Sequence, residues 1–198
     1  MVTVLFSDIR DFTSLTERMP PERIVHLLNS YSEKMVQVIF AHGGMLDKFT
    51  GDGIMAVFGA PNNRLDDQLQ AARAAIAMQL ALNELNQELE AEGLPAISMG
   101  VGLATGEVVA GSIGTKDRME YTVIGNAANL ASRIQNMSRD MGVDILTEDV
   151  TVHALGDAIK TTEVGVVRIR GVEKPMRLWT FIIDRHLGTA EKTEQTEV

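Results

Sequence analysis

The chain contains no cysteine, so disulfide bonds, thiolate metal ligands and cysteine nucleophiles are all excluded. It has no run near the ~18 apolar residues that cross a bilayer, and no basic segment followed by an apolar one at its start. Positive charge is scarce, because 18 Lys and Arg stand against 27 Asp and Glu and give a formal net charge of −9. This balance argues against a broad surface for nucleic acid or membrane lipid, while a small anionic ligand held by metal ions or a few cations stays open.

What remains is the composition of one folded domain. The chain has 198 residues, of which 45% are hydrophobic and 23% charged, so a sizeable core is possible and wholesale disorder is excluded. It opens directly into an apolar strand, and we expect a cytoplasmic domain that is part of a longer, regulated protein. The last dozen residues, 187–198, are polar and lack aromatic side chains, which predicts a disordered tail after a domain of residues 1–186.

Apolar periodicity and turn-forming residues predict the order of the elements. The first part predicts a strand (2–6), a helix from Pro20-Pro21 to Gly43-Gly44, a hairpin (45–49 and 54–58), a helix from Asp66-Asp67 to Gly93, and a strand through 99–103. This βαββαβ order is the split ferredoxin-like arrangement and predicts an α+β fold. A C-terminal α/β extension follows, with strands at 108–113, 121–124, 143–146, 164–169 and 178–183 and helices at 126–137 and 149–155.

Two carboxylates stand at neighbouring strand ends of this predicted sheet. Asp8 follows the first strand, and Asp52 lies in the tight turn of the hairpin, whose strands flank the first strand in a ferredoxin-like sheet. Paired carboxylates suit Mg²⁺, which takes one or two of them and leaves its other positions to water and phosphate oxygens. The alternative is that Asp52 only forms the turn and Asp8 is only a loop acid, and the spacing alone does not choose.

The segment from Ser7 to Thr13 connects the first strand to a short helix. Backbone N–H groups in such a turn can receive phosphate oxygens, although the segment is not glycine-rich and matches no P-loop. Local evidence favours the alternative of an ordinary connection in which Thr13 or Ser14 caps the helix.

Four further polar residues are weak signals when taken singly. Asn129 and Arg133 lie four residues apart on one helix and share a face, which suits charge on a phosphoryl group but also describes a surface pair. Lys48 and Thr122 each interrupt an apolar strand, as solvated or edge positions also do.

In combination these segments resemble the catalytic domain of class III adenylyl and guanylyl cyclases. The resemblance is carried, in order, by Leu5-Phe6-Ser7-Asp8-Ile9, by Lys48-Phe49-Thr50-Gly51-Asp52-Gly53, and by Tyr121-Thr122-Val123-Ile124-Gly125-Asn126 with Asn129 and Arg133. The resemblance runs from about residue 2 to residue 183. The joint order and spacing of its motifs outweigh the purely structural interpretation that each motif allows when taken alone. The resemblance implies a ferredoxin-like fold of nucleotide cyclase type, in agreement with the element order.

The resemblance also implies roles for individual residues. Asp8 and Asp52, aided by the carbonyl of Ile9, match the positions that hold two Mg²⁺ or Mn²⁺ ions, and the turn at Phe12 and Thr13 matches a phosphate-binding position. Lys48 and Thr122 match the positions that contact the purine edge. Asn129 matches the residue that orients the ribose, and Arg133 the one that stabilises the transition state. Arg170 matches a basic residue that meets the terminal phosphates.

The implied reaction is attack of the ribose 3′-hydroxyl on the α-phosphate, giving cyclic nucleotide and pyrophosphate. Guanylyl cyclases typically carry Glu where this chain has Lys48, and Lys donates to adenine N1, so ATP is expected and GTP is the alternative. Thr122 in place of Asp resembles a bicarbonate-responsive subgroup, which makes bicarbonate a hypothetical activator. The family works as a head-to-tail dimer, so we expect a homodimer with two shared sites.

Two positions depart from the family, and two other interpretations compete. Asp11 stands where Gly is usual and adds negative charge near the phosphates, and Glu107 stands where some relatives carry Arg. The chain could instead be a catalytically weak dimerisation module, although all the principal positions hold competent residues. A diguanylate cyclase would show a Gly-Gly-Asp/Glu-Glu-Phe hairpin, whereas this hairpin contains Thr50-Gly51-Asp52-Gly53.

Overall fold

The computed structural model describes residues 1–183, so the expected tail at 187–198 and the exact domain limit at residue 186 lie outside the described residues. In chain order the elements are β1 (Val2–Ile9), α1 (Phe12–Thr16), α2 (Pro21–Ala41), β2 (Met45–Thr50), β3 (Gly53–Phe58), α3 (Asp67–Ala91), β4 (Met99–Gly106), β5 (Val109–Gly114), β6 (Met119–Ile124), α4 (Asn126–Met137), β7 (Ile145–Glu148), α5 (Asp149–Leu155), the 3₁₀ helix η1 (Gly156–Ala158), β8 (Thr161–Val167) and β9 (Met176–Phe181). Within the described residues, no helix is both long and apolar enough to cross a membrane.

A seven-stranded sheet with the order β2-β3-β1-β4-β7-β9-β8 forms the centre of the fold. Its first four strands, with α2 and α3, are the predicted ferredoxin-like core, and β1 pairs antiparallel with both β3 and β4. Strand β7 adds parallel to β4, and β9 and β8 continue the sheet as the C-terminal extension. The predicted α+β class is therefore confirmed.

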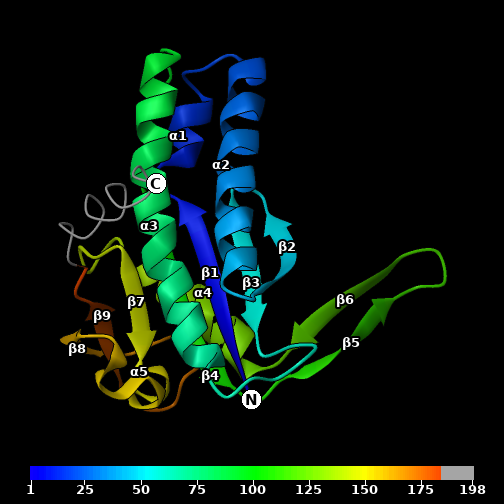
Figure 1. Ribbon diagram of the computed structural model, residues 1–198, viewed down its shortest axis with the longest axis vertical. Helices are drawn as coiled ribbons and strands as arrows, with labels where there is room; N and C mark the ends of the chain where they lie inside the picture. Colours follow the sequence, from blue (N-terminus) through cyan, green and yellow to red (C-terminus); the bar gives the residue numbers. More distant parts are fainter. Residues whose placement is uncertain (184–198) are drawn as a thin grey trace, which may run out of the picture.

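Helices cover both faces of this sheet, and adjacent residues of β1 show the two sides. Leu5 belongs to the core beneath α2 and α3, whereas Val4 belongs to a second core beneath α4. Both side chains are fully buried, as expected for a central strand whose successive residues point to opposite faces. Figure 1 shows the long helices α2 and α3 lying side by side over one face.

Small residues let α4 approach β4 closely. A Cβ atom added at Gly102 would lie 2.3 Å from the backbone nitrogen of Gln135 and 2.4 Å from the carbonyl oxygen of Ala131. Real Cβ contacts do not come so near, so a glycine is required for the observed spacing. This packing fixes the position of the helix that carries Asn129 and Arg133.

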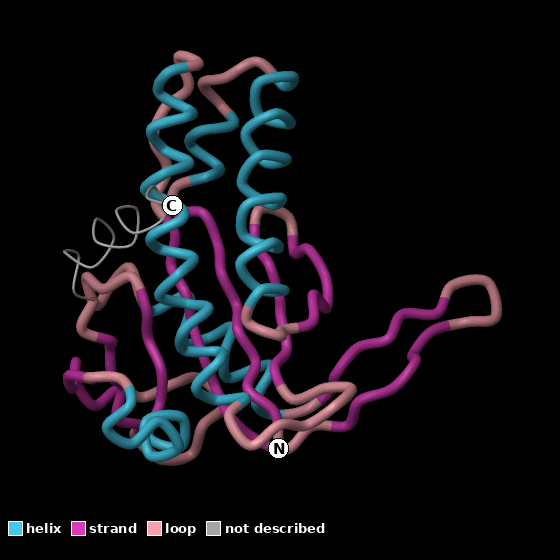
Figure 2. The backbone as a smooth tube through the Cα atoms, in the orientation of Figure 1, coloured by secondary structure: helices cyan, strands magenta, loops and turns pink. Residues whose placement is uncertain are grey.

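Strands β5 and β6 form a separate two-stranded ribbon that projects from the body (Figure 1). The tube in Figure 2 shows its far turn well away from every helix. Large apolar side chains on the ribbon are exposed, namely Val109, Ile113, Met119, Tyr121 and Ile124. A projecting ribbon with exposed apolar residues is a feature of protein interaction surfaces.

Several element boundaries differ from those predicted. The strand predicted at 143–146 is Ile145–Glu148, and the closing pair predicted at 164–169 and 178–183 is Thr161–Val167 and Met176–Phe181. These edges follow cross-strand pairing and capping: Thr147 and Glu148 pair with β9, while the Glu148 carboxylate accepts from backbone N–H groups that begin α5. Apolar pattern alone does not carry such information.

Candidate active site

The two predicted metal-binding carboxylates lie together at one end of the central strands. Ser7 pairs with Ile54 in the β1–β3 ladder, which places Asp8 of β1 beside Asp52 in the β2–β3 turn. Close packing at this point requires Gly53, because a Cβ there would lie 2.7 Å from the Ser7 carbonyl oxygen and 3.1 Å from an Asp8 carboxylate oxygen.

Partial burial and mutual repulsion of the Asp8 and Asp52 carboxylates favour binding of a cation between them. The pKa of Asp8 is raised from 3.8 to about 7, chiefly by burial and then by the hydrogen bond to Asp52 and its negative charge, against a lowering by the Ile9 backbone N–H. Within residues 1–183 no cluster of three or more His, Asp or Glu side chains forms around a cation position. Two adjacent carboxylates with a neighbouring carbonyl are hard oxygen ligands, and they fit Mg²⁺ or Mn²⁺.

A buried tyrosine supports the strand behind these carboxylates. The hydroxyl of Tyr31 in α2 lies 3.2 Å from the Ser7 hydroxyl and 3.1 Å from the Met99 sulfur. Complete burial raises the pKa of Tyr31, so the phenol stays neutral and acts as a hydrogen-bonding group. Apolar periodicity along a helix does not indicate such a hydrogen-bonding role for Tyr31.

The segment after Asp8 forms a turn into the short helix α1, and the alternative in which Thr13 or Ser14 caps that helix is wrong. Phe12 and Thr13 are the first residues of α1, so neither Thr13 nor Ser14 caps it, and Thr13 instead accepts a hydrogen bond from the Thr16 hydroxyl through its carbonyl. Asp11 precedes the helix in the left-handed conformation with φ of 57°, which Asp tolerates better than most residues. Its carboxylate lies 2.6 Å from the Arg139 guanidinium, so the extra negative charge has a partner.

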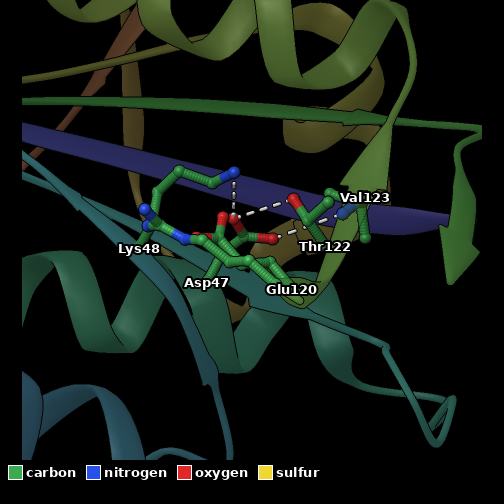
Figure 3. Close-up of polar contacts among 6 residues, drawn as sticks. Asp47, Lys48, Glu120, Thr122 and Val123 are labelled. Carbon is green, nitrogen blue, oxygen red and sulfur yellow. Dashed lines mark hydrogen bonds and ion pairs between the residues drawn. The ribbon is translucent and has the colours of Figure 1, made fainter. Parts of the chain in front are cut away.

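The two predicted purine-edge residues meet through a third residue, Asp47 (Figure 3). The Thr122 hydroxyl donates to one Asp47 oxygen at 2.9 Å, and the Val123 backbone N–H donates to the other at 3.2 Å. The Lys48 ammonium lies 3.3 Å from the same oxygen that Thr122 contacts. Lys48 and Thr122, 74 positions apart in sequence, are thus brought to one site.

A β-bulge explains how adjacent residues Asp47 and Lys48 reach the same site. The β2–β3 register pairs Leu46 with Ala56 and Lys48 with Met55, so Asp47 is the additional residue in β2. A regular strand would point Asp47 and Lys48 to opposite faces, whereas a bulge redirects a side chain. Asp47 is not among the residues predicted to form the site, and its one sequence signal is an acid next to Lys48 in a mainly apolar strand.

The residues predicted to contact ribose and phosphorus line a pocket of about 390 Å³ between α4 and the segment after β8. Asn129 and Arg133 project into it from α4, and Gly171, Glu173 and Met176 complete the other side. The Arg133 guanidinium donates to the carbonyl oxygen of Arg170. The structure therefore brings Asn129, Arg133 and the Arg170 backbone together.

Three groups of candidate residues form, but they do not merge within one chain. One group holds Asp8 and Asp52, the second Lys48 and Thr122, and the third surrounds Arg133. Among residues 1–183, no hydrogen bond or ion pair joins one group to another, and the lining of the Arg133 pocket includes neither carboxylate.

Comparison with known proteins relates these features to a family. Residues 1–184 match the family described as "Adenylate and Guanylate cyclase catalytic domain". "Adenylate cyclase 1" of Rhizobium meliloti (strain 1021) is 32% identical over 96% of this chain, and "Adenylate cyclase" of Anabaena cylindrica is 42% identical over 78% of it. The matched regions are 29% and 30% of those two proteins, so the chain spans under a third of these curated relatives.

Solved structures agree in fold. The guanylyl cyclase Cya2 is 41% identical with a TM-score of 0.85, covering 91% of this chain and 90% of that one. The adenylyl cyclase CyaB from P. aeruginosa is 32% identical with a TM-score of 0.87, covering 93% and 95% respectively. With its fold, its ordered motifs and a match along nearly the whole length, the chain belongs to the family of class III adenylate and guanylate cyclase catalytic domains.

Proposed function

We propose that this domain converts ATP to 3′,5′-cyclic AMP and pyrophosphate. The observation that carries the choice of ATP is the Lys48 ammonium beside Thr122, since an ammonium only donates hydrogen bonds. Adenine N1 accepts a hydrogen bond, whereas guanine N1 carries a hydrogen and needs an acceptor. GTP is the alternative substrate, favoured by the 41% identity to a structure described as a guanylyl cyclase.

Asp8 and Asp52, with the Ile9 carbonyl, are the residues proposed to hold two divalent cations. When bound, such cations lower the pKa of the attacking ribose hydroxyl and offset the charge of the triphosphate. The raised pKa of Asp8 supports this assignment, because a nearby cation would relieve the unfavourable charge of the pair. Backbone N–H groups in the turn at Phe12 and Thr13 are proposed to contact phosphate oxygens.

Residues of α4 act at the reacting centre in this proposal. Asn129 orients the ribose so that its 3′-oxygen is in line with the α-phosphorus, which reduces the entropy cost of reaching the transition state. Arg133 donates to oxygens on which negative charge builds as pyrophosphate leaves. Arg170, which precedes the pocket residue Gly171, is proposed to meet the terminal phosphates, and Arg133 would exchange its present carbonyl partner for phosphate oxygens.

A homodimer with two shared sites accounts for the lack of any hydrogen bond or ion pair between the candidate groups within residues 1–183 of one chain. In this arrangement Asp8 and Asp52 of one protomer face Lys48, Thr122, Asn129 and Arg133 of the other. The projecting β5–β6 ribbon offers exposed apolar residues for the interface, including Val109 at 73% exposure and Met119 at 57%.

A mixing experiment tests the shared site. Asp8→Ala and Arg133→Ala proteins are each expected to be inactive alone, and their mixture should regain activity, because each heterodimer has one site with both groups intact. Size-exclusion chromatography with differently tagged chains confirms exchange. Exchange without any recovery contradicts a site shared between protomers.

Bicarbonate activation follows from Thr122 and is proposed as a secondary property. Turnover should rise when sodium bicarbonate replaces sodium chloride at constant pH and ionic strength. An unchanged rate removes this part of the proposal without affecting the assignment of the reaction.

The decisive assay incubates the purified domain with Mn²⁺ and either ATP or GTP and separates the products by chromatography. Cyclic AMP as the main product supports the proposal. Cyclic GMP as the main product would show that the alternative substrate is right, and no cyclic product from a dimeric, folded protein would favour a catalytically weak dimerisation module.

A further inference from the structure

We propose that Asp47 is a positioning residue that selects adenine by fixing the direction of the Thr122 hydroxyl. The inference rests on the proposed function, because it assigns a base-selecting role within the proposed ATP site. It concerns a residue that contacts Thr122 and Lys48 rather than one that must touch the nucleotide.

Asp47 is held on several sides. Its side chain has 0% exposure, while that of Lys48 remains 38% exposed at the mouth of the site. One carboxylate oxygen receives the Thr122 hydroxyl and faces the Lys48 ammonium, and the other receives the Val123 backbone N–H. The β2 bulge at Asp47 places the carboxylate between β2 and β6.

This arrangement determines which way the Thr122 hydroxyl is directed. A hydroxyl has one hydrogen and two lone pairs, and a carboxylate facing an ammonium and an N–H group is an acceptor. The hydrogen of Thr122 is therefore committed to Asp47, and only lone pairs remain for a ligand. A threonine without such a partner could rotate and either donate or accept.

The resulting pair of groups matches one purine. Lys48 presents a donor, and Thr122 presents an acceptor. Adenine offers the N1 lone pair and the N6 amino hydrogens, which are complementary to that pair. Guanine offers the opposite order, with O6 as an acceptor and N1–H as a donor. The Thr122 hydroxyl alone could bind either base, and the contact with Asp47 makes it an acceptor that favours adenine.

Replacement of Asp47 by Asn is the sharpest perturbation because it nearly preserves shape. In one orientation, the Asn NH₂ group would face the Val123 N–H, placing two donors together. In the other, its oxygen keeps the Val123 bond and its NH₂ donates to Thr122, which turns the hydroxyl hydrogen outward. This second orientation satisfies Thr122 and Val123 and presents a donor to guanine O6, while the 38% exposed Lys48 ammonium loses its Asp47 partner and turns to solvent.

The experiment measures kcat/KM for ATP and for GTP in the wild-type protein, Asp47→Asn and the matched control Asp157→Asn, whose side chain is exposed on η1. We expect the ATP-to-GTP ratio to fall by about tenfold in Asp47→Asn, as for inversion of one hydrogen bond, and to stay unchanged in the control. A merely structural role would lower both activities together, so partial misfolding does not change the ratio.

A second comparison places the effect at the hydroxyl. In a Thr122→Val background, Asp47→Asn should change the ratio by less than about twofold, because no hydroxyl remains to be turned. An equal shift with and without the Thr122 hydroxyl would overturn the inference, as would an unchanged ratio in Asp47→Asn against a wild type that prefers ATP. A wild type that prefers GTP would overturn both the proposed substrate and the inference. The two outcomes above overturn the inference alone, so the two kinds of failure can be told apart.

Discussion

Replacing Asp8 by Asn is expected to stabilise the metal-free domain and to weaken its response to Mn²⁺. The two effects have opposite signs because the Asp8 carboxylate destabilises the metal-free protein and is proposed to bind the metal ion. Without a cation, the ionised Asp8 is desolvated and repelled by Asp52, so a neutral side chain of nearly the same shape removes an unfavourable charge. With a cation, the same replacement removes a proposed ligand.

The size of the metal-free effect follows from the pKa of Asp8. A rise from 3.8 to about 7 corresponds to an upper value of about 4 kcal/mol for the ionised side chain. Asp8 is only half-buried, and solvent screening reduces this to roughly 1–2 kcal/mol. For a domain of this size, the gain raises the melting temperature by about 2–8 °C.

The pH dependence has a definite sign. The folded protein holds the Asp8 proton more tightly than the unfolded chain between pH 3.8 and about 7, so wild-type stability falls as pH rises through that window. Above about pH 7 this loss of stability is complete, and the stability difference in favour of Asp8→Asn is greatest. Near pH 4 wild-type Asp8 is itself protonated when folded, and the two proteins should have similar stability.

Thermal unfolding measured at pH 4, 6 and 8, with EDTA or with Mn²⁺, tests these statements, and Asp157→Asn is the control for loss of an exposed acid. Wild-type protein at a Mn²⁺ concentration 100 times its Kd should gain about 2.7 kcal/mol, and Asp8→Asn should lose most of this gain. The reasoning is refuted if Asp8→Asn is the less stable protein at pH 8 in EDTA, or if its Mn²⁺ response equals that of wild type.

Three further substitutions probe separate parts of the domain. Arg133→Ala should lower kcat roughly 10²-fold with little change in KM, and a loss confined to KM in steady-state assays would contradict a transition-state role. Arg139→Gln leaves Asp11 without its ion-pair partner and should raise the KM for ATP about twofold to fivefold, with restoration in the Asp11→Gly/Arg139→Gln double variant. Gly102→Ala brings a methyl group against the α4 backbone and should cost about 1–3 kcal/mol or more of unfolding free energy; an unchanged melting temperature would contradict the close packing.

The fold was largely predictable because its signals are local. Pro21 at the start of α2, the glycines after it and the acidic start of α3 bound long helices that the structure contains. The shift of β7 from 143–146 to Ile145–Glu148 has a different origin, because that strand ends where Glu148 both pairs with β9 and caps α5. Such endpoints depend on partners far along the chain.

The acid pair could also be anticipated from topology. A βαββαβ order places the first strand beside the third, so residues at the end of one and the turn of the other must be neighbours. The pairing of Ser7 with Ile54 realises this for Asp8 and Asp52. The expectation that this pair holds Mg²⁺ or Mn²⁺ does not follow from topology alone and comes from the ordered motifs of the resemblance.

Asp47 lay beyond sequence reasoning for a physical reason. Alternation along β2 assigns Asp47 and Lys48 to opposite faces, and only the bulge between Leu46 and Lys48 reverses that assignment. The partner Thr122 is 75 positions away, on a ribbon that belongs to a different sheet. A side chain with two such non-local requirements leaves no periodic trace in the sequence. If Asp47 sets the direction of the Thr122 hydroxyl, substrate choice depends on a residue that purine-edge motifs do not include, and two cyclases with the same Lys and Thr could differ in their preference between ATP and GTP.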